Sequence, residues 1–189
     1  DYRGIELVSN NSGDTYVLFS QYDTANGYER CIFRVGDTSI TVLSSLPGGP
    51  TPGVSTINAL DTVLLPTSFT ETIGVMGKPK GNQLTFDSSG NPHVVWTEGN
   101  AGSGAAYYYD GSTGTVTNLS NLPGGPGMGG GTPDEVQIFV DSKDEVHIHY
   151  IQYNPVSGPT GSFFPATNSN KDNYYYRKSD GWVQNMQYV

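Results

Sequence analysis

Basic residues are scarce in this chain of 189 residues, and their scarcity excludes one class of partner. Nine Lys and Arg stand against eighteen Asp and Glu, which gives a net charge of −9. Proteins that bind nucleic acid carry clustered basic residues, and none cluster here, so no nucleic-acid partner is expected. Long apolar runs are lacking as well. No stretch approaches the roughly 18 apolar residues of a membrane-spanning helix, so we expect no membrane span.

Cysteine is nearly absent, since Cys31 is the single one and has no partner for an internal disulfide. It lies in the apolar run Cys31-Ile32-Phe33, which predicts a buried thiol rather than a nucleophile or a metal ligand. Hydrophobic residues make up a modest 35% of the chain, whereas Gly (25), Pro (12) and Tyr (13) are abundant. Many short strands joined by Gly and Pro turns have this composition. We therefore expect one all-β domain over residues 1–189.

An internal repeat is the most informative feature of the chain. The segments 84–96 and 138–150 share an Asp, the Ser after it, a His and a final aromatic residue. A looser copy opens the chain, with Asn10 in the place of Asp87 and Tyr16 in the place of His93. The second halves of the copies also correspond, at 31–34, 107–110 and 174–177. Three copies follow, at about 5–46, 79–122 and 133–189, with an irregular insert at 50–76.

Each copy predicts four antiparallel strands. The first ends at Asp87 or Asp141, whose carboxylate is expected to bond backbone N–H groups two residues on and form a tight turn. The second is an apolar run, the third carries the Tyr residues, and the fourth covers 115–119 or 182–186. Four antiparallel strands repeated at roughly 50 residues are typical of a β-propeller blade.

The pattern D-x-x-G-x-x-H, then an apolar strand, a Tyr-rich strand and G-W, resembles the blade repeats of secreted bacterial β-propellers. These include the sialidase-like (BNR-type) repeat families. The resemblance implies an extracellular, propeller-like all-β fold. Three blades do not close a ring, because four is the usual minimum. The chain is therefore expected to be part of a larger propeller, to be completed by other copies of itself, or to close irregularly, and we favour the first.

The aromatic and histidine residues of the repeats are the candidates for binding a glycan. The expected ligand-binding set comprises His93, His147, His149, Trp96, Tyr107, Tyr109, Tyr174, Tyr176, Arg177, Phe163 and Phe164. Phe163 and Phe164 belong to a long insertion at 154–173. The equivalence of His93 and His147 favours a structural bond to a neighbouring strand. Packing between blades is the alternative for most of the aromatic residues, leaving one or two to face a ligand.

Metal binding and glycosylation have further candidates in the turns. Asp87, Asp141 and Asp144 offer the oxygen ligands that calcium prefers, although turn capping explains all three better. His147 and His149 share a face of one strand, but zinc would need a third ligand. The sequons at Asn10 and Asn118 are candidate glycosylation sites and fit an extracellular protein. No other cofactor is expected.

These observations favour a non-catalytic extracellular propeller that binds glycans or acts as a surface or assembly module. Two alternatives stay open: a segment of a carbohydrate-active enzyme (polysaccharide lyase or glycoside hydrolase), and a structural subunit of an extracellular filament or coat. Sialidase activity is disfavoured, because the resemblance would imply three Arg around a carboxylate and the chain has four Arg in total. No catalytic residue is assigned.

Overall fold

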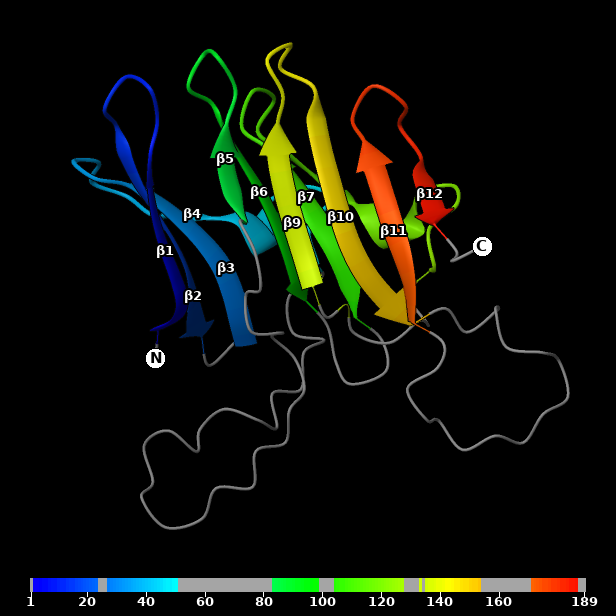
Figure 1. Ribbon diagram of the computed structural model, residues 1–189. Coiled ribbons are helices and arrows are strands. Elements are labelled where there is room, and N and C mark those ends of the chain that lie inside the picture. The colour runs from blue at the N-terminus through cyan, green and yellow to red at the C-terminus, as the bar shows by residue number, and fades with distance from the viewer. Residues whose placement is uncertain are drawn as a thin grey trace, which may run out of the picture.

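Each sequence repeat folds into a four-stranded antiparallel sheet (Figure 1). The computed structural model describes residues 2–23, 27–50, 83–98, 104–127, 133, 135–153 and 171–186. In this part of the chain the strands of each sheet lie in sequence order, so each sheet is a simple meander. We call the sheets blade 1, blade 2 and blade 3. The expected all-β, blade-based propeller fold is confirmed.

The strands follow the repeat closely. Blade 1 contains β1 (Tyr2–Ser9), β2 (Thr15–Asp23), β3 (Gly27–Arg34) and β4 (Thr41–Val42). Blade 2 contains β5 (Leu84–Phe86), β6 (Pro92–Glu98), β7 (Ala105–Asp110) and β8 (Thr115–Asn118). Blade 3 contains β9 (Glu135–Val140), β10 (Val146–Tyr153), β11 (Lys171–Arg177) and β12 (Val183–Met186). The last strands of blades 2 and 3 are each one residue shorter than expected.

Two core layers hold the blades side by side. Because side chains alternate along a strand, each sheet has one face toward the blade before it and one toward the blade after it. Between blades 1 and 2 the buried residues include Leu18, Ile32, Leu84, Val94 and Trp96. Between blades 2 and 3 they include Val95, Tyr108, Ile138, Ile148 and Tyr174. Cys31 is fully buried, and burial raises the pKa of its thiol to about 12, so the predicted buried thiol is confirmed.

The repeated Leu-Pro-Gly-Gly linkers fix the spacing of the blades. A short 3-10 helix precedes each linker: η1 (Leu43–Ser45) after β4, and η3 (Leu119–Asn121) after β8. The linker carbonyl of Pro47 accepts a hydrogen bond from Val116 N in β8 (3.2 Å), and that of Pro123 accepts one from Val183 N in β12 (2.9 Å). Each linker therefore lies against the last strand of the next blade. No helix among the described residues has the length and apolarity to cross a membrane.

Candidate functional site

The three equivalent turns between the first two strands of each blade are closed by an Asn or Asp side chain. Asp87 Oδ1 accepts from the backbone N–H groups two and four residues on, at 3.0 and 2.8 Å. Asp141 makes the same pair of bonds at 2.8 and 3.0 Å, and Asn10 at 3.0 and 2.9 Å. The expected turn capping is confirmed for Asp87 and Asp141. The Oδ1 atoms of Asp87 and Asp141, two of the residues proposed for calcium, are thus engaged within their own turns.

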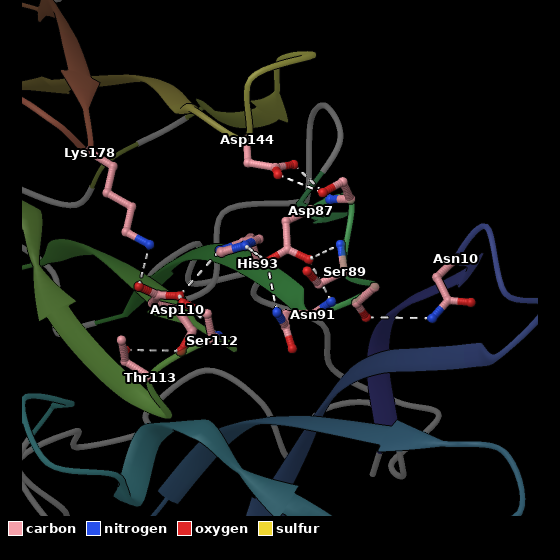
Figure 2. Close-up of polar contacts among 12 residues, drawn as sticks. Asn10, Asp87, Ser89, Asn91, His93, Asp110, Ser112, Thr113, Asp144 and Lys178 are labelled. Atoms are coloured by element: carbon pink, nitrogen blue, oxygen red, sulfur yellow. Dashed lines mark hydrogen bonds and ion pairs between the residues drawn. The ribbon is translucent and has the colours of Figure 1, made fainter.

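The expected turn capping is wrong for Asp144, because its carboxylate bonds another blade instead. Its carboxylate accepts from Ser88 N (2.7 Å) and from Ser88 Oγ (2.6 Å) across the boundary between blades 2 and 3 (Figure 2). Lys178 of blade 3 lies with its Nζ 2.6 Å from Asp110 Oδ2 of blade 2. Among the described residues, no three His, Cys, Asp or Glu side chains are grouped to hold a metal ion.

His93 and His147 occupy equivalent places and make equivalent bonds. The Nδ1 atom of His93 lies 2.8 Å from the Tyr108 hydroxyl, and its Nε2 lies 3.5 Å from Asp87 Oδ2. For His147 the corresponding distances, to Tyr175 and Asp141, are 2.6 and 3.5 Å. Each histidine therefore bonds the third strand of its blade through Nδ1 and lies against its capped turn through Nε2, which in His93 has no hydrogen-bond partner among the described residues. This arrangement serves a structural task.

The surroundings of His93 also suit a structural task better than proton transfer. The residue is 1% exposed, and burial lowers the pKa of its imidazole while raising that of the Tyr108 hydroxyl. Both groups therefore stay neutral near pH 7. A general acid or base works best with a pKa near the working pH, and neither group is shifted that way.

His93 is buried and His147 is partly exposed, so replacing each with alanine is expected to have a different effect on stability. His93→Ala leaves the buried Tyr108 hydroxyl without its partner, and should lower the free energy of unfolding by about 2 kcal/mol. His147→Ala should cost about half as much, because that ring is partly exposed and water can replace it. Urea unfolding followed by tryptophan fluorescence measures both. Equal losses in the two variants would contradict the structural interpretation.

The Tyr triplets place their outer and central rings on opposite faces. Tyr107 (3% exposed) faces blade 1 across the boundary between blades 1 and 2. Tyr174 and Tyr176 face blade 2 across the boundary between blades 2 and 3. Trp96 stacks on Tyr107 with centroids 5.5 Å apart and is buried as well. Of the outer tyrosines, Tyr109 alone remains partly exposed. The central Tyr108 and Tyr175 are the ones that bond the histidines.

Three other candidates lie together on the far face of blade 3. His147, His149 and Arg177 share this face, because the register pairs His147 with Arg177 and His149 with Tyr175. Their neighbours include Phe139, whose exposed ring stacks on His147 at 4.4 Å. The repeat comparison did not single out Phe139 or Tyr175. Arg177 is held in place by Asp180, at 3.0 and 2.7 Å.

A second group of aromatic rings lies at the boundary between blades 1 and 2. Tyr16 and Phe86 have ring centroids 5.1 Å apart, and Tyr109 completes what we call the inter-blade aromatic cluster. All three rings are partly exposed. Arg34 lies directly opposite Tyr16 in the register and is 47% exposed, with its Nε 3.7 Å from Asp14 and 3.8 Å from Asp37. Aromatic faces thus adjoin a cation and two carboxylates.

The next boundary differs at the equivalent positions. Between blades 2 and 3 the places of Tyr16 and Phe86 are taken by His93, which is buried, and Val140. The place of Arg34 is taken by Asp110, which Lys178 neutralises. The sequence signal for this aromatic cluster was therefore that Tyr16, Phe86 and Arg34 differ from the residues at the same positions of the next copy. The histidine that the repeats share was not a signal for it.

A buried polar contact joins the blades at the opposite end of the strands, and the sequence comparison missed it. Ser44 Oγ accepts from Arg30 N (2.7 Å) and donates to Glu98 Oε2 of the next blade (2.7 Å). Ser120 and Gln152 repeat this contact at 2.7 Å between blades 2 and 3. Burial raises the pKa of Glu98 to about 7. Ser44 and Ser120 occupy the same place in the two copies of the linker, and this match could have predicted the contact.

The remaining candidates fall outside these groups. Asn10 is 9% exposed, and its amide nitrogen donates to Asp14 (3.2 Å) and to Gly90 O (3.5 Å). Asn118 caps η3 by accepting from Asn121 N at 3.2 Å. Both sequon side chains therefore have structural bonds. Phe163, Phe164 and residues 51–76 of the irregular insert lie outside the described residues.

No protein-family model and no curated protein matches the chain. Among solved structures it is similar to a fucose lectin from Kordia zhangzhouensis in complex with methyl-fucoside (TM-score 0.48, 13% identity, 98% of this chain and 99% of that chain). It is also similar to a thermostable family-43 glycoside hydrolase (TM-score 0.47, 10% identity, 100% and 59%). An endo-arabinase from Bacteroides thetaiotaomicron VPI-5482 is similar with a TM-score of 0.43 and 13% identity, over 98% of this chain and 61% of that chain. The chain thus spans about three fifths of the two hydrolases.

Proposed function

We propose that the chain is a non-catalytic, extracellular propeller module that binds neutral glycans at the inter-blade aromatic cluster. The observation that carries the proposal is a group of partly exposed rings, Tyr16, Phe86 and Tyr109, in which Tyr16 lies directly opposite Arg34. Sites for small ligands combine aromatic walls with a few convergent polar groups, and this boundary has both. The equivalent boundary between blades 2 and 3 is closed by His93 and by the ion pair of Lys178 with Asp110.

The charges around the cluster favour a neutral sugar. Arg34 is shared between Asp14 and Asp37, so the site offers both hydrogen-bond donors and acceptors without a net positive charge. A sugar ring presents C–H groups to an aromatic face and hydroxyls at its rim, and hydroxyls both donate and accept. An acidic glycan would meet a protein of net charge −9. Extracellular placement, and kinship with the sialidase-like blades, are supported by the repeat pattern around Asp87 and Asp141.

Binding to an array of neutral and acidic oligosaccharides tests this assignment. Arg34→Gln is expected to weaken binding of a neutral hit at least tenfold, because hydrogen bonds to a charged group contribute about 1.5–3 kcal/mol. Arg177→Gln is the matched control, since Arg177 is similarly exposed, paired with an Asp, and on a different face. Its binding should match that of the unchanged chain.

The outcomes separate the competing functions. Equal binding by Arg34→Gln and the unchanged chain would refute the site. Loss in Arg177→Gln instead would move the site to the far face of blade 3. Release of reducing ends from a polysaccharide by the unchanged chain, abolished in His93→Ala at a temperature where that variant is folded, would favour the alternative of a carbohydrate-active enzyme.

A further inference from the structure

The end blades each have one sheet face that the neighbouring described blade does not cover. We call the side of a blade toward the preceding blade its front face, and the side toward the following blade its back face. The back face of blade 3 is the far face described above. Blade 2 packs its front face on blade 1 and its back face on blade 3. The front face of blade 1 and the back face of blade 3 remain. Figure 1 shows the three sheets side by side, with blades 1 and 3 at the two ends.

The front face of blade 1 exposes apolar residues that the other blades bury. Leu7 pairs with Val17 as Ile138 pairs with Ile148, so Leu7 and Ile138 are equivalent. Leu7 is 67% exposed, whereas Ile138 is 2% exposed because it packs on blade 2. Two residues earlier, Ile5 is 66% exposed and its equivalent Val136 is 3% exposed. The front edge of blade 1 therefore has the chemistry of a buried inter-blade edge.

The back face of blade 3 has the construction of an inter-blade face as well. Tyr175 repeats the bond that Tyr108 makes to a histidine, and Tyr108 is buried beneath blade 3. Phe139 is 56% exposed on this face and stacks on His147. Met186, which pairs with Asn173 on the same face, is 42% exposed. Apolar surface that is exposed in this way marks an interaction site.

We propose that the back face of blade 3 binds the front face of blade 1 in a second copy of this chain, so that two chains close one six-bladed ring. The contact continues the blade 1–2 and blade 2–3 interfaces already present in the chain, in the same head-to-tail sense. Head-to-tail interfaces form rings when the rotation closes. Propellers have typically four to eight blades, so two chains of three blades fit this range and three chains do not. The sugar site lies within one chain, at the boundary between blades 1 and 2, and is independent of this contact.

Mass measurement tests the ring. Size-exclusion chromatography with light scattering, over a range of protein concentrations, should give twice the chain mass of 20.3 kDa. Leu7→Asp and Phe139→Asp should each raise the dissociation constant at least tenfold, because each places a carboxylate in an apolar contact. Both side chains are exposed in the single chain, so neither substitution places a carboxylate in the core of its own chain. Ser12→Asp adds the same charge at an exposed turn off both faces, and should leave the mass unchanged.

A mixing experiment distinguishes the head-to-tail contact from a symmetric one. A ring of one Leu7→Asp chain and one Phe139→Asp chain keeps one of its two interfaces intact, so the mixture should regain a two-chain species that neither variant forms alone. The proposal is overturned by a chain that stays monomeric at every concentration, or by a dimer that survives either substitution. A mass that keeps growing with concentration would replace the closed ring with an open polymer and overturn it too.

Discussion

Gly124→Ala is expected to destabilise the protein strongly, because the added methyl group would collide with the backbone of the next blade. A Cβ atom at Gly124 would lie 2.0 Å from the carbonyl oxygen of Val183, in the last strand of blade 3. The residue also has a φ of +82°, where any L side chain is strained. The obstructing atom is backbone, so it moves only if the linker separates from β12. Gly48 meets Val116 in the same way, also at 2.0 Å, which makes the contact a property of the repeat.

Gly114→Ala is the control that has the backbone strain of a positive φ without a collision of the added methyl group. Gly114 has a φ of +72° with nothing within 4 Å of an added Cβ, so its substitution should cost only the strain of about 1–2 kcal/mol. Gly124→Ala should cost at least about 2 kcal/mol more than that, as overpacked sites do. Urea unfolding curves of the two variants give the comparison. Similar losses in both would show that the linker yields easily and that it does not fix the blade spacing.

The fold could be predicted from the sequence repeat because the residues that form each blade lie close together in the sequence. The Asp turn, the apolar second strand and the Tyr strand all lie within about 40 residues, so matching copies predicted matching sheets. The turns of Asp87 and Asp141 and the burial of Cys31 followed directly. The third copy of the turn, at Asn10, was found on the same ground.

What lies between blades was less accessible to prediction. Alternation showed that Tyr107 and Tyr109 share a face, but both faces of a middle blade are buried, so alternation did not say which rings stay exposed. Tyr109 stays partly exposed at a boundary that it shares with Tyr16, some 90 residues away in sequence. Phe139 was missed because exposure on an end blade depends on what covers that blade, which no local pattern encodes.

The burial of Glu98 gives the stability of the fold a dependence on pH. Burial raises the pKa of Glu98 from 4.5 to about 7, although Ser44 and Trp96 both donate to its carboxylate. The folded state therefore holds the proton more tightly than the unfolded state does. The contribution is fully present below pH 4.5 and is lost as the pH rises through 7. At 1.36 kcal/mol for each pKa unit, the loss is roughly 3 kcal/mol.

Glu98→Gln should remove most of this loss. Gln152 already makes the equivalent contact in blade 3, where its Oε1 accepts from Ser120 and its Nε2 donates to Gly104 O at 3.0 Å. An uncharged amide is therefore compatible with the same place, and the variant should be close to the unchanged chain at pH 5 and more stable at pH 8. Free energies of unfolding from urea titrations at several pH values measure the change.

The comparison must be made as a difference between the two proteins, because His93 acts in the opposite sense. Burial lowers the pKa of His93 below 6.5, so its contribution is present above that pH and is lost as the pH falls. This contribution is common to both proteins and cancels in the difference.

Glu145→Gln is the control, since the pKa of Glu145 is lowered and its contribution is lost only in acid below pH 4.5. A Glu98→Gln curve parallel to that of the unchanged chain between pH 5 and 8 would show that the carboxylate is already ionised in the folded protein. Arg30, buried beside it with a pKa lowered to about 10, would then be the cation that holds the charge.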